Sequence, residues 1–349
     1  MAKKIKVGII GAGQVSQLQH IPGAQQSPYA EVVAVADTNK KRCREAAEKF
    51  GIPNTFTDYR DLLAMDEIDA VSIALPNCLH YLVTMAALKA GKHAMCDKPM
   101  AMNQQEAKRM IDEAKKRRLT FMIGQNMRFS RENQLAKKVI ASGKIGEPYH
   151  ARGRLQRRNG IPRIGSWFTQ KKYSGGGVLL DLGVHVLDLT LHLMGSFDVQ
   201  AVSGQVFTKF GKKGLGDGTW GMSERAKAKP YDVEDYAAAF LKLKGGKSVI
   251  LEVCWHAYLK PGHAVEIYGT KGGVSTPPAM ILGEKKDIEP PIAPETAKVP
   301  LPTERLVHFI DCIVKKKKPV CDPHESLMVQ KVLDAIYKSS ETGREVRIR

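Results

Sequence analysis

Two acidic and two histidine side chains repeat at helical spacing in the middle of the chain. Asp181, His185, Asp188 and His192 are 4, 3 and 4 residues apart, in an otherwise apolar stretch that follows three glycines. At 3.6 residues per turn, these side chains share one narrow face of a helix. Ionisable groups on so apolar a helix need partners or a polar cavity.

Asp181 and His185 have the spacing expected of a general base and the group that orients it. A carboxylate at position i reaches an imidazole at i+4, holds it in one tautomer and leaves its other nitrogen to accept a proton. Two other interpretations stay open, a buried pair that satisfies only itself and a zinc site. All four side chains lie on one helix, so we expect no metal, and we interpret Asp188 and His192 as structural.

A lysine follows the apolar run at 93–96, in the sequence Cys96-Asp97-Lys98-Pro99. Ligands bind at the carboxyl edge of the sheet in folds of this kind, and the proline fixes the adjoining backbone. An ammonium group there can polarise a substrate hydroxyl or stabilise the alkoxide as it forms. A solvated strand end is the default for an isolated lysine, but beside a nucleotide-binding fold we interpret Lys98 as functional.

A glycine-rich turn after the first apolar run predicts a phosphate-binding loop. The motif Gly11-x-Gly13-x-x-Ser16 departs from G-x-G-x-x-G at its third glycine, where a small residue still permits close packing of helix and strand. Gly13 lets the backbone approach a pyrophosphate at the helix N-terminus. Asp37 ends the next apolar run about 24 residues beyond Gly13, where its carboxylate can accept hydrogen bonds from the adenosine ribose.

The same carboxylate bears on the choice of cofactor. Asp37 would repel a 2′-phosphate, which favours NAD over NADP. Lys40, Lys41 and Arg42 follow closely and soften that repulsion, so NADP remains an alternative.

The elements that must position these residues begin with a parallel sheet. Strand-length apolar runs occur at 5–10, 31–36, 70–75, 93–96 and 119–123. Helical patterns lie between them, at 40–50, 79–90 and 104–118. Strands that are apolar on both faces and alternate with helices indicate a parallel sheet covered on two sides.

A different pattern follows residue 125. Longer strands joined by glycine-containing turns predict a mostly antiparallel sheet. We expect these strands near 147–158, 198–208, 233–243, 247–256 and 263–268, then an irregular loop over 277–302 and helices near 303–316 and 323–340.

Composition excludes several classes of protein. The 349 residues favour two domains, and 43% hydrophobic with 26% charged residues is typical of a globular protein with a real core. The net charge of +18 is dispersed in short clusters without interleaved aromatics, so we expect no nucleic-acid partner. We expect no membrane, because no apolar run approaches the ~18–20 residues needed to cross a bilayer. The six cysteines form no C-x-x-C pair, which suits reduced thiols of the cytoplasm.

Several stretches together resemble the Gfo/Idh/MocA oxidoreductases, the family of glucose–fructose oxidoreductase and myo-inositol dehydrogenase. The ordered set spans essentially the whole chain. The matching pieces are Val7 to Gly13, Ala74 to Asn77 with His80, Ala90 to Pro99, Gly124 to Asn126 with Arg128, Gly175 to Gly195, Tyr268 to Gly273 and Ser340 to Gly343.

The resemblance implies an α/β N-terminal Rossmann domain at 1–125 and an α+β C-terminal domain with a large, mostly antiparallel open sheet at 126–349. That sheet often forms the face used in dimers or tetramers, so we expect a homodimer or homotetramer. The resemblance also implies reversible hydride transfer between NAD(P) and a secondary alcohol carbon of a sugar or cyclitol.

Site residues follow from the matching positions. Lys98 matches the family's E-K-P lysine, and Asp181 and His185 match its D-x-x-x-H pair. Asp97 replaces the usual glutamate expected near the nicotinamide ribose, which shortens the side chain by one methylene. The expected cofactor contacts are Gly11, Ala12, Gly13, Gln14, Val15, Asp37, Thr38, Leu75, Pro76, Asn77, His80, Asp97, Lys98, Asn126 and Arg128.

The expected mechanism has His185 remove the hydroxyl proton, Lys98 stabilise negative charge on oxygen and Asp181 orient His185. Further substrate contacts are expected from Arg154, Arg157 and Trp167, and less strongly from His256 and Tyr258.

Two other functions stay open. One is a glycosidase that uses bound NAD for a transient oxidation, and the other is a non-catalytic nucleotide-binding sugar sensor.

Overall fold

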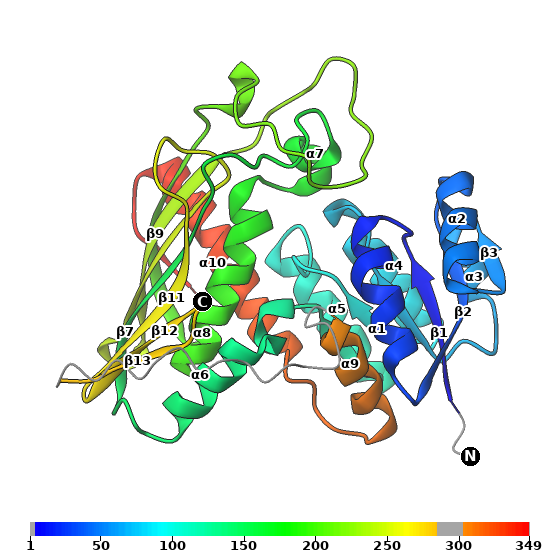
Figure 1. The fold of residues 1–349 in the computed structure, drawn as a ribbon, viewed down its shortest axis with the longest axis horizontal. Coiled ribbons are helices and arrows are strands. Elements are labelled where there is room, and N and C mark those ends of the chain that lie inside the picture. Colours follow the sequence, from blue (N-terminus) through cyan, green and yellow to red (C-terminus); the bar gives the residue numbers. More distant parts are fainter. Residues whose placement is uncertain (1–3, 285–302, 349) are drawn as a thin grey trace. The chain divides into compact units, whose positions relative to one another are not determined.

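The first apolar runs of the chain form a six-stranded parallel sheet in the order β3-β2-β1-β4-β5-β6 (Figure 1). This is the strand order of a dinucleotide-binding Rossmann fold. The strands are β1 Ile5–Ile10, β2 Ala30–Ala36, β3 Asn54–Phe56, β4 Ala70–Ile73, β5 His93–Cys96 and β6 Phe121–Ile123. The short strand β3 was not expected from the sequence.

The helices of the first unit alternate with these strands along the chain and pack on the sheet. They are the π-helical turn η1 Ser16–His20, α1 Ile21–Gln26, α2 Lys40–Phe50, α3 Tyr59–Leu63, α4 Asn77–Lys89 and α5 Gln104–Arg117. Leu62 of α3, Leu88 of α4 and Met110 of α5 share one buried cluster with Ile10 and Ile73 of the strands. Burial on both sides explains why these strands are almost continuously apolar.

The computed structural model describes residues 4–284 and 303–348, in two compact units. Of these residues, the first unit holds 4–126, 221–223 and 303–327, and the second unit holds the others. Helix α9, Glu304–Val314, therefore belongs to the first unit, where it contacts α1. A single domain boundary at 125/126, as expected from the sequence, leaves out these later segments of the first unit.

An eight-stranded sheet forms the second unit, in the order β13-β12-β11-β7-β10-β9-β8-β14. All neighbouring strands are antiparallel except β7 and β10, so the expected mostly antiparallel sheet is confirmed. The strands are β7 Pro148–Gln156, β8 Val199–Phe207, β9 Tyr236–Leu243, β10 Ser248–Cys254, β11 Gly262–Gly269, β12 Gly272–Thr276, β13 Met280–Leu282 and β14 Val346–Arg347.

The irregular loop expected over 277–302 is corrected at its start, because β13 pairs there with β12. Residues 285–302 of that expectation lie outside the described residues.

One face of the second sheet is covered by helices. The chain adds α6 Arg131–Ala141, α7 Lys171–Ser174, the π-helical turn η4 Leu179–Gly183, α8 Val184–Met194 and α10 Pro323–Thr342. Figure 1 shows α8 alongside the strands of this sheet. Leu187 and Leu191 of α8 and Ile336 of α10 share a buried cluster with Val253 and Ile267 of the sheet.

The opposite face of this sheet carries large apolar side chains that are 38–40% exposed, namely Phe207, Phe240, Ile250 and Tyr268. We call these four residues and the strand surface around them the open face. Phe240 and Ile250 lie directly opposite each other on β9 and β10, so the patch is continuous across these strands.

The segment Lys171–Met194 corrects the expectation that no apolar run reaches membrane length. By length and composition alone it is able to cross a membrane, with a mean hydropathy of 1.5 over its best 18-residue window. That window is 83% buried inside the protein, as in the core helix of a folded domain.

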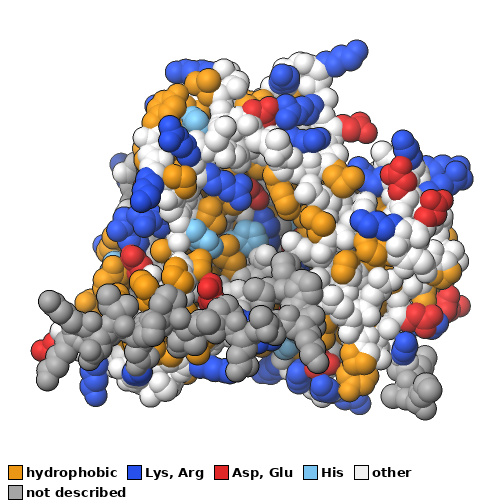
Figure 2. Space-filling view, viewed as in Figure 1, with side chains coloured by type: hydrophobic (Ala, Val, Ile, Leu, Met, Phe, Trp, Pro, Cys, Tyr) orange, Lys and Arg blue, Asp and Glu red, His pale blue; other side chains and the backbone are white. Residues whose placement is uncertain are grey.

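Basic side chains are dispersed over the face drawn in Figure 2, as the sequence indicated. Figure 2 shows Lys and Arg spread over the visible face, with Asp and Glu among them.

Candidate active site

The phosphate loop of the first unit requires glycine at its first position. Gly11 has φ +97°, and a Cβ there would lie 2.2 Å from the carbonyl oxygen of Ala74. Gly13 is different, because no described atom lies within 4 Å of the position that its Cβ would take. Ser16 is fully buried, which fits the packing role expected at the third motif position. The open approach at Gly13, followed by helix η1, fits a pyrophosphate.

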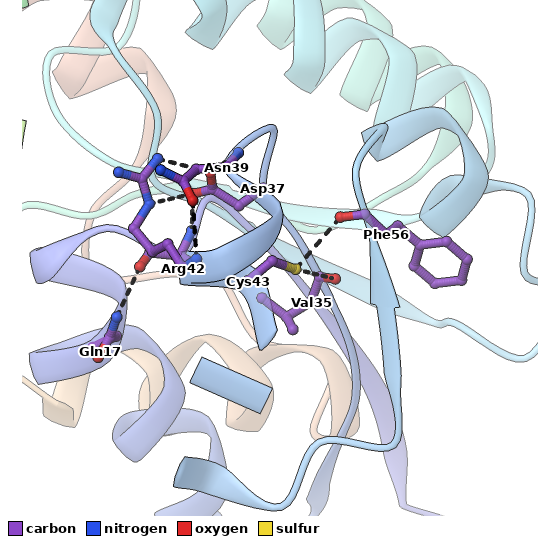
Figure 3. A network of polar contacts seen from close by, with 8 residues as sticks. Gln17, Val35, Asp37, Asn39, Arg42, Cys43 and Phe56 are labelled. Atoms are coloured by element: carbon purple, nitrogen blue, oxygen red, sulfur yellow. Dashed lines mark hydrogen bonds and ion pairs between the residues drawn. The ribbon is translucent and has the colours of Figure 1, made fainter. Parts of the chain in front are cut away.

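Asp37 at the end of β2 is held by four donors (Figure 3). One oxygen, Oδ2, accepts from the Ala12 backbone N at 2.8 Å, and Oδ1 accepts from the Asn39 N at 2.8 Å. Arg42 adds a two-pronged contact, with Nε 3.1 Å from Oδ2 and Nη2 2.7 Å from Oδ1. The carboxylate therefore ties the phosphate loop to the end of β2. The sequence placed Arg42 only nearby, whereas the structure pairs it directly with Asp37.

Lys98 lies half-buried beyond β5, next to a buried polar network that the sequence did not reveal. Asp97 Oδ1 accepts from the Lys98 backbone N at 2.9 Å. The other oxygen lies 3.4 Å from His20 Nε2 and 3.8 Å from Arg305 Nη2. Arg305 comes from α9, 285 residues from His20, so no local pattern indicated the contact.

The protonation states of this network follow from its partners. Burial alone would raise the pKa of Asp97, but the charge of Arg305 outweighs burial and holds the pKa well below the usual range. Burial lowers the pKa of His20. Arg305 can only donate, so His20 Nε2 accepts at 2.8 Å and the proton of a neutral ring sits on Nδ1, facing Ser72 Oγ at 2.7 Å.

His80, expected as a cofactor contact, is 1% exposed and binds two turns of the first unit together. Its Nδ1 lies 2.7 Å from the Pro99 carbonyl and its Nε2 lies 2.9 Å from the Leu75 carbonyl. Burial lowers the pKa of this histidine, and a neutral ring donates to one of the two oxygens at a time. These contacts make His80 a support for the turns before α4 and after Lys98.

Other expected cofactor positions lie around these loops. Gln14 and Val15 are half-buried in the phosphate loop, Thr38 is exposed after Asp37, and Pro76 and Asn77 begin α4. The Asn126 Oδ1 is buried without a hydrogen-bond partner among the described residues. An orphaned acceptor of this kind is a place for a ligand donor.

In the second unit, Asp181 and His185 begin the buried helix. Asp181 lies in the π turn η4 and His185 in the first turn of α8, and both are half-buried. The indole Nε1 of Trp255, a fully buried side chain, donates to Asp181 Oδ2 at 2.9 Å. The π turn changes the simple 3.6-residue geometry that the sequence predicted, and such turns occur often at functional sites.

Asp188, the third member of the stripe, pairs with Arg128. Arg128 Nε lies 2.7 Å from Asp188 Oδ2 and Nη2 lies 2.6 Å from Oδ1, with both side chains almost completely buried. Asp188 is therefore structural, as expected. Arg128 was expected to contact the cofactor, but the structure commits two of its donors to this pair. His192 has its pKa lowered to about 3, first by burial and then by the charges of Arg128 and Lys137.

Glu234 and Tyr337 hold the start of the helix and were missed by sequence reasoning. Glu234 is buried, and Oε1 accepts from the backbone N of Gly177 and Leu179, each at 2.9 Å. Tyr337 Oη donates to the same oxygen at 2.9 Å. A Cβ at Gly177 would lie 2.0 Å from the Glu234 carbonyl oxygen, which explains a glycine there. The sequence signal that could have revealed Glu234 is its place just before the apolar strand β9.

The expected substrate contacts do not all come together. Gly153 of β7 faces Val186 and Thr190 of α8, so the next residue, Arg154, lies on the opposite face of the sheet, away from Asp181 and His185. Arg157 lines a pocket near the carboxyl end of β7. Trp167 stacks on Phe168 with ring centroids 3.8 Å apart.

The two weaker candidates form an aromatic cluster with Phe210. His256 is 8% exposed and lies 5.3 Å from Tyr258 between ring centroids, while Tyr258 is 76% exposed. Within residues 4–284 and 303–348, no group of three or more His, Cys, Asp or Glu side chains is arranged to hold a metal ion.

Comparison with known proteins places this architecture in a family. Residues 5–125 match the oxidoreductase family model with an NAD-binding Rossmann fold, and residues 133–275 match the GFO/IDH/MocA C-terminal domain. The chain is 30% identical to D-glucoside 3-dehydrogenase of Escherichia coli (strain K12) over 99% of this chain and 97% of that protein. It is 32% identical to levoglucosan dehydrogenase of Pseudarthrobacter phenanthrenivorans over 78% of this chain and 73% of that protein.

A solved structure agrees with the sequence relatives. The fold superimposes on levoglucosan dehydrogenase in complex with NADH and levoglucosan, with a TM-score of 0.85 and 25% identity over 99% of this chain and 100% of that chain. With the glycine turn, the carboxylate after β2 and the second, mostly antiparallel sheet described above, these matches show that the chain belongs to the Gfo/Idh/MocA family of NAD-binding oxidoreductases.

Proposed function

We propose that this protein oxidises a secondary alcohol carbon of a sugar, sugar derivative or cyclitol, with NAD+ as acceptor. The observation that carries the proposal is Asp181, which accepts a hydrogen bond from the buried Trp255 indole one helical turn before His185. Two relatives support the substrate class, since they are named as dehydrogenases of a glucoside and of levoglucosan.

The reaction converts CH–OH and NAD+ into C=O, NADH and a proton. NAD+ supplies the hydride acceptor when it is bound. The residues that would hold it are Gly11 to Val15 around the pyrophosphate, Asp37 at the adenosine ribose, and Asn126, whose orphaned Oδ1 is a ready acceptor. The open position at Gly13 leaves room for the phosphates.

In this proposal His185 accepts the hydroxyl proton, and Asp181 orients His185. The Trp255 hydrogen bond fixes the carboxylate that performs the orienting. Lys98 stabilises the negative charge that develops on the substrate oxygen. The network of Asp97, His20 and Arg305 fixes the backbone that presents Lys98.

The test is a panel of sugars, inositols, anhydrosugars and glycosides, followed at 340 nm with NAD+ and NADP+ separately. For the best substrate, His185→Ala is expected to lower kcat by about 10²–10⁴-fold because a positioned base is lost. Lys98→Ala is expected to lower kcat by about 10²–10³-fold because a preorganised donor is lost. NADH affinity, read from its fluorescence, is expected to be unchanged in His185→Ala.

The double variant tests whether the two side chains serve one step. If they do, the combined loss is far smaller than the product of the two single losses. Near-normal turnover by His185→Ala would show that the base is assigned wrongly. The assay also separates the redox-assisted glycosidase, because only a dehydrogenase accumulates NADH in proportion to product.

We also propose that the open face is a subunit interface of a homo-oligomer, because it exposes large apolar side chains on adjacent strands. All six cysteines carry free thiols, which supports a cytoplasmic setting for the reaction.

A further inference from the structure

A polar pocket lies in the second unit, beyond the carboxyl end of β7. Its volume is about 460 Å³, within the range of small-molecule sites. Arg157 and Asn159 line it from one loop, and Asp217, Thr219 and Trp220 line it from another, together with two glycines. We call it the outer pocket. Nothing in the proposed mechanism uses it.

Backbone hydrogen bonds fasten the two loops of the outer pocket to each other. Ile161 N donates to the Gly216 carbonyl at 2.8 Å, and Gly218 N donates to the Ile161 carbonyl at 2.8 Å. A Cβ at Gly218 would lie 2.9 Å from the Ile161 carbonyl oxygen, so the close approach depends on that glycine. The walls of the pocket are therefore built by reciprocal contacts between segments more than 50 residues apart in the chain.

Asp217 helps to hold the two loops of the outer pocket in place. Its Oδ1 accepts from the Ile164 N at 2.8 Å, and its Oδ2 pairs with Arg225 Nη1 at 2.6 Å. Both carboxylate oxygens thus have protein donors, and Arg225 neutralises the charge. The side chains left to meet a ligand are those of Arg157, Asn159, Thr219 and Trp220.

The lining indicates the chemical class of the ligand. Because Arg225 pairs with Asp217, Arg157 is the one charged side chain of the lining that is left to a ligand, and its N–H groups can donate to the oxygens of neutral hydroxyl groups. Asn159 and Thr219 offer both donors and acceptors, which suit hydroxyl groups. Trp220 is 39% exposed, and its large apolar face can cover a ring while its neighbours bind polar substituents. These features fit a neutral polyhydroxylated ring.

The outer pocket lies at the same end of the sheet as Asp181. Arg157 directly follows β7, and its backbone N donates to the Cys254 carbonyl, the last residue of β10, at 3.0 Å. The next residue, Trp255, donates to Asp181. One strand pair therefore links the pocket to the carboxylate of the proposed catalytic pair.

We propose that the outer pocket is a subsite for the second ring of a glycoside, so that the preferred substrate carries a neutral sugar on the ring that is oxidised. This inference rests on the proposed function, because the first ring must be held at His185. It assigns Trp220 and Thr219 as residues that determine specificity without taking part in proton transfer.

The experiment compares D-glucose with cellobiose, maltose and trehalose, both in turnover with NAD+ and in calorimetric titration of the NADH-loaded enzyme. At least one disaccharide is expected to exceed glucose in kcat/KM and to bind about 10-fold more tightly. Trp220→Ala is expected to lower kcat/KM for that disaccharide about 10-fold and to leave glucose within 2-fold. Thr219→Val, which keeps the side-chain shape, is expected to act in the same direction.

Tyr149→Ala is the matched control. Tyr149 is 52% exposed near the opposite end of β7, so its loss removes an exposed aromatic side chain without touching the pocket. It is expected to leave both sugars unchanged. An unaltered unfolding midpoint and NADH affinity in each variant show that the fold is intact.

The outcomes separate this inference from the proposed function. If no sugar is oxidised but the disaccharide binds more tightly and loses that advantage in Trp220→Ala, the proposed function fails and the subsite stands. Equal binding of glucose and all disaccharides, or an equal effect of Trp220→Ala on both, overturns the subsite. Selective binding of a uronic acid or sugar phosphate over the neutral disaccharides also overturns it, because a charged group would then be the true ligand.

Discussion

Asp97 shows at the scale of single residues how a one-methylene change is accommodated. The sequence led us to expect this carboxylate near the nicotinamide ribose, as a short replacement for the family's glutamate. In the structure, its oxygens are directed to the Lys98 backbone and toward His20 and Arg305. Arg305 is 2% exposed, so its charge needs a buried counter-ion, and Asp97 provides one.

Removing Arg305 is expected to destabilise the protein in a pH-dependent way. Arg305→Leu leaves Asp97 without its buried cation, at a cost of about 3–5 kcal/mol in the free energy of unfolding at pH 7. The folded pKa of Asp97 lies below its unfolded value of about 3.9, so the stabilisation is present above that pH and is lost as the pH falls further. Urea denaturation from pH 3 to pH 8 measures this.

The difference between wild type and Arg305→Leu should therefore be largest near neutrality and shrink below about pH 4. Arg60→Leu is the control, because Arg60 pairs with Asp58 at the surface, where an ion pair adds little. An equal loss at pH 3 and pH 7 would contradict the role given to Asp97.

At the scale of elements, helix η4–α8 determines where Asp181 and His185 lie. Its N-terminus is fastened by Glu234, which accepts from the backbone N of Gly177 and Leu179. An acidic group at this end also complements the positive end of the helix dipole. The start of the helix is thus positioned by Glu234, which lies just before β9, and by Tyr337 of α10. The helix's own sequence does not supply these contacts.

Gly177→Ala tests this arrangement. The new Cβ would meet a backbone oxygen at 2.0 Å, and backbone cannot move aside cheaply. We expect a loss of about 1–3 kcal/mol in unfolding free energy, with a fall in kcat as η4 shifts. Gly283→Ala is the control, because no described atom lies within 4 Å of its Cβ position. An unchanged unfolding midpoint and kcat in Gly177→Ala would contradict the proposed close approach.

At the scale of the whole molecule, the second sheet differs from the first in that its open face has no covering helix among the described residues. Phe207, Phe240, Ile250 and Tyr268 remain substantially exposed there. Exposed apolar patches of adjoining side chains commonly mark contact surfaces between proteins. The isologous pairing of two such faces would form a dimer, the commonest closed assembly.

Size-exclusion chromatography with light scattering measures the predicted assembly. Wild type is expected to elute as a dimer or tetramer, and Phe240→Glu combined with Ile250→Lys is expected to shift it toward monomer. Val320→Lys changes an exposed apolar residue of the first unit and serves as the control. A wild-type protein that is monomeric at all concentrations would refute the interface.

The amino-acid sequence was enough to predict the parallel sheet, its glycine turn, Asp37 and the apolar helix with Asp181 and His185. These depend on local periodicity and on residues with special backbone freedom, which can be recognised within about 30 residues. The small strands β3, β13 and β14 escaped detection because runs of two or three residues carry no period.

The pairing of buried polar groups became visible only in the folded chain. Arg305 with His20, Arg128 with Asp188 and Trp255 with Asp181 are brought together across 285, 60 and 74 residues. Arg154 was expected to contact the substrate. Because successive residues of a strand point to opposite faces, its side chain lies on the face of the sheet away from α8. The physical reason is that a buried donor or charge must find a partner in space, and spatial neighbours are set by how sheets and helices pack.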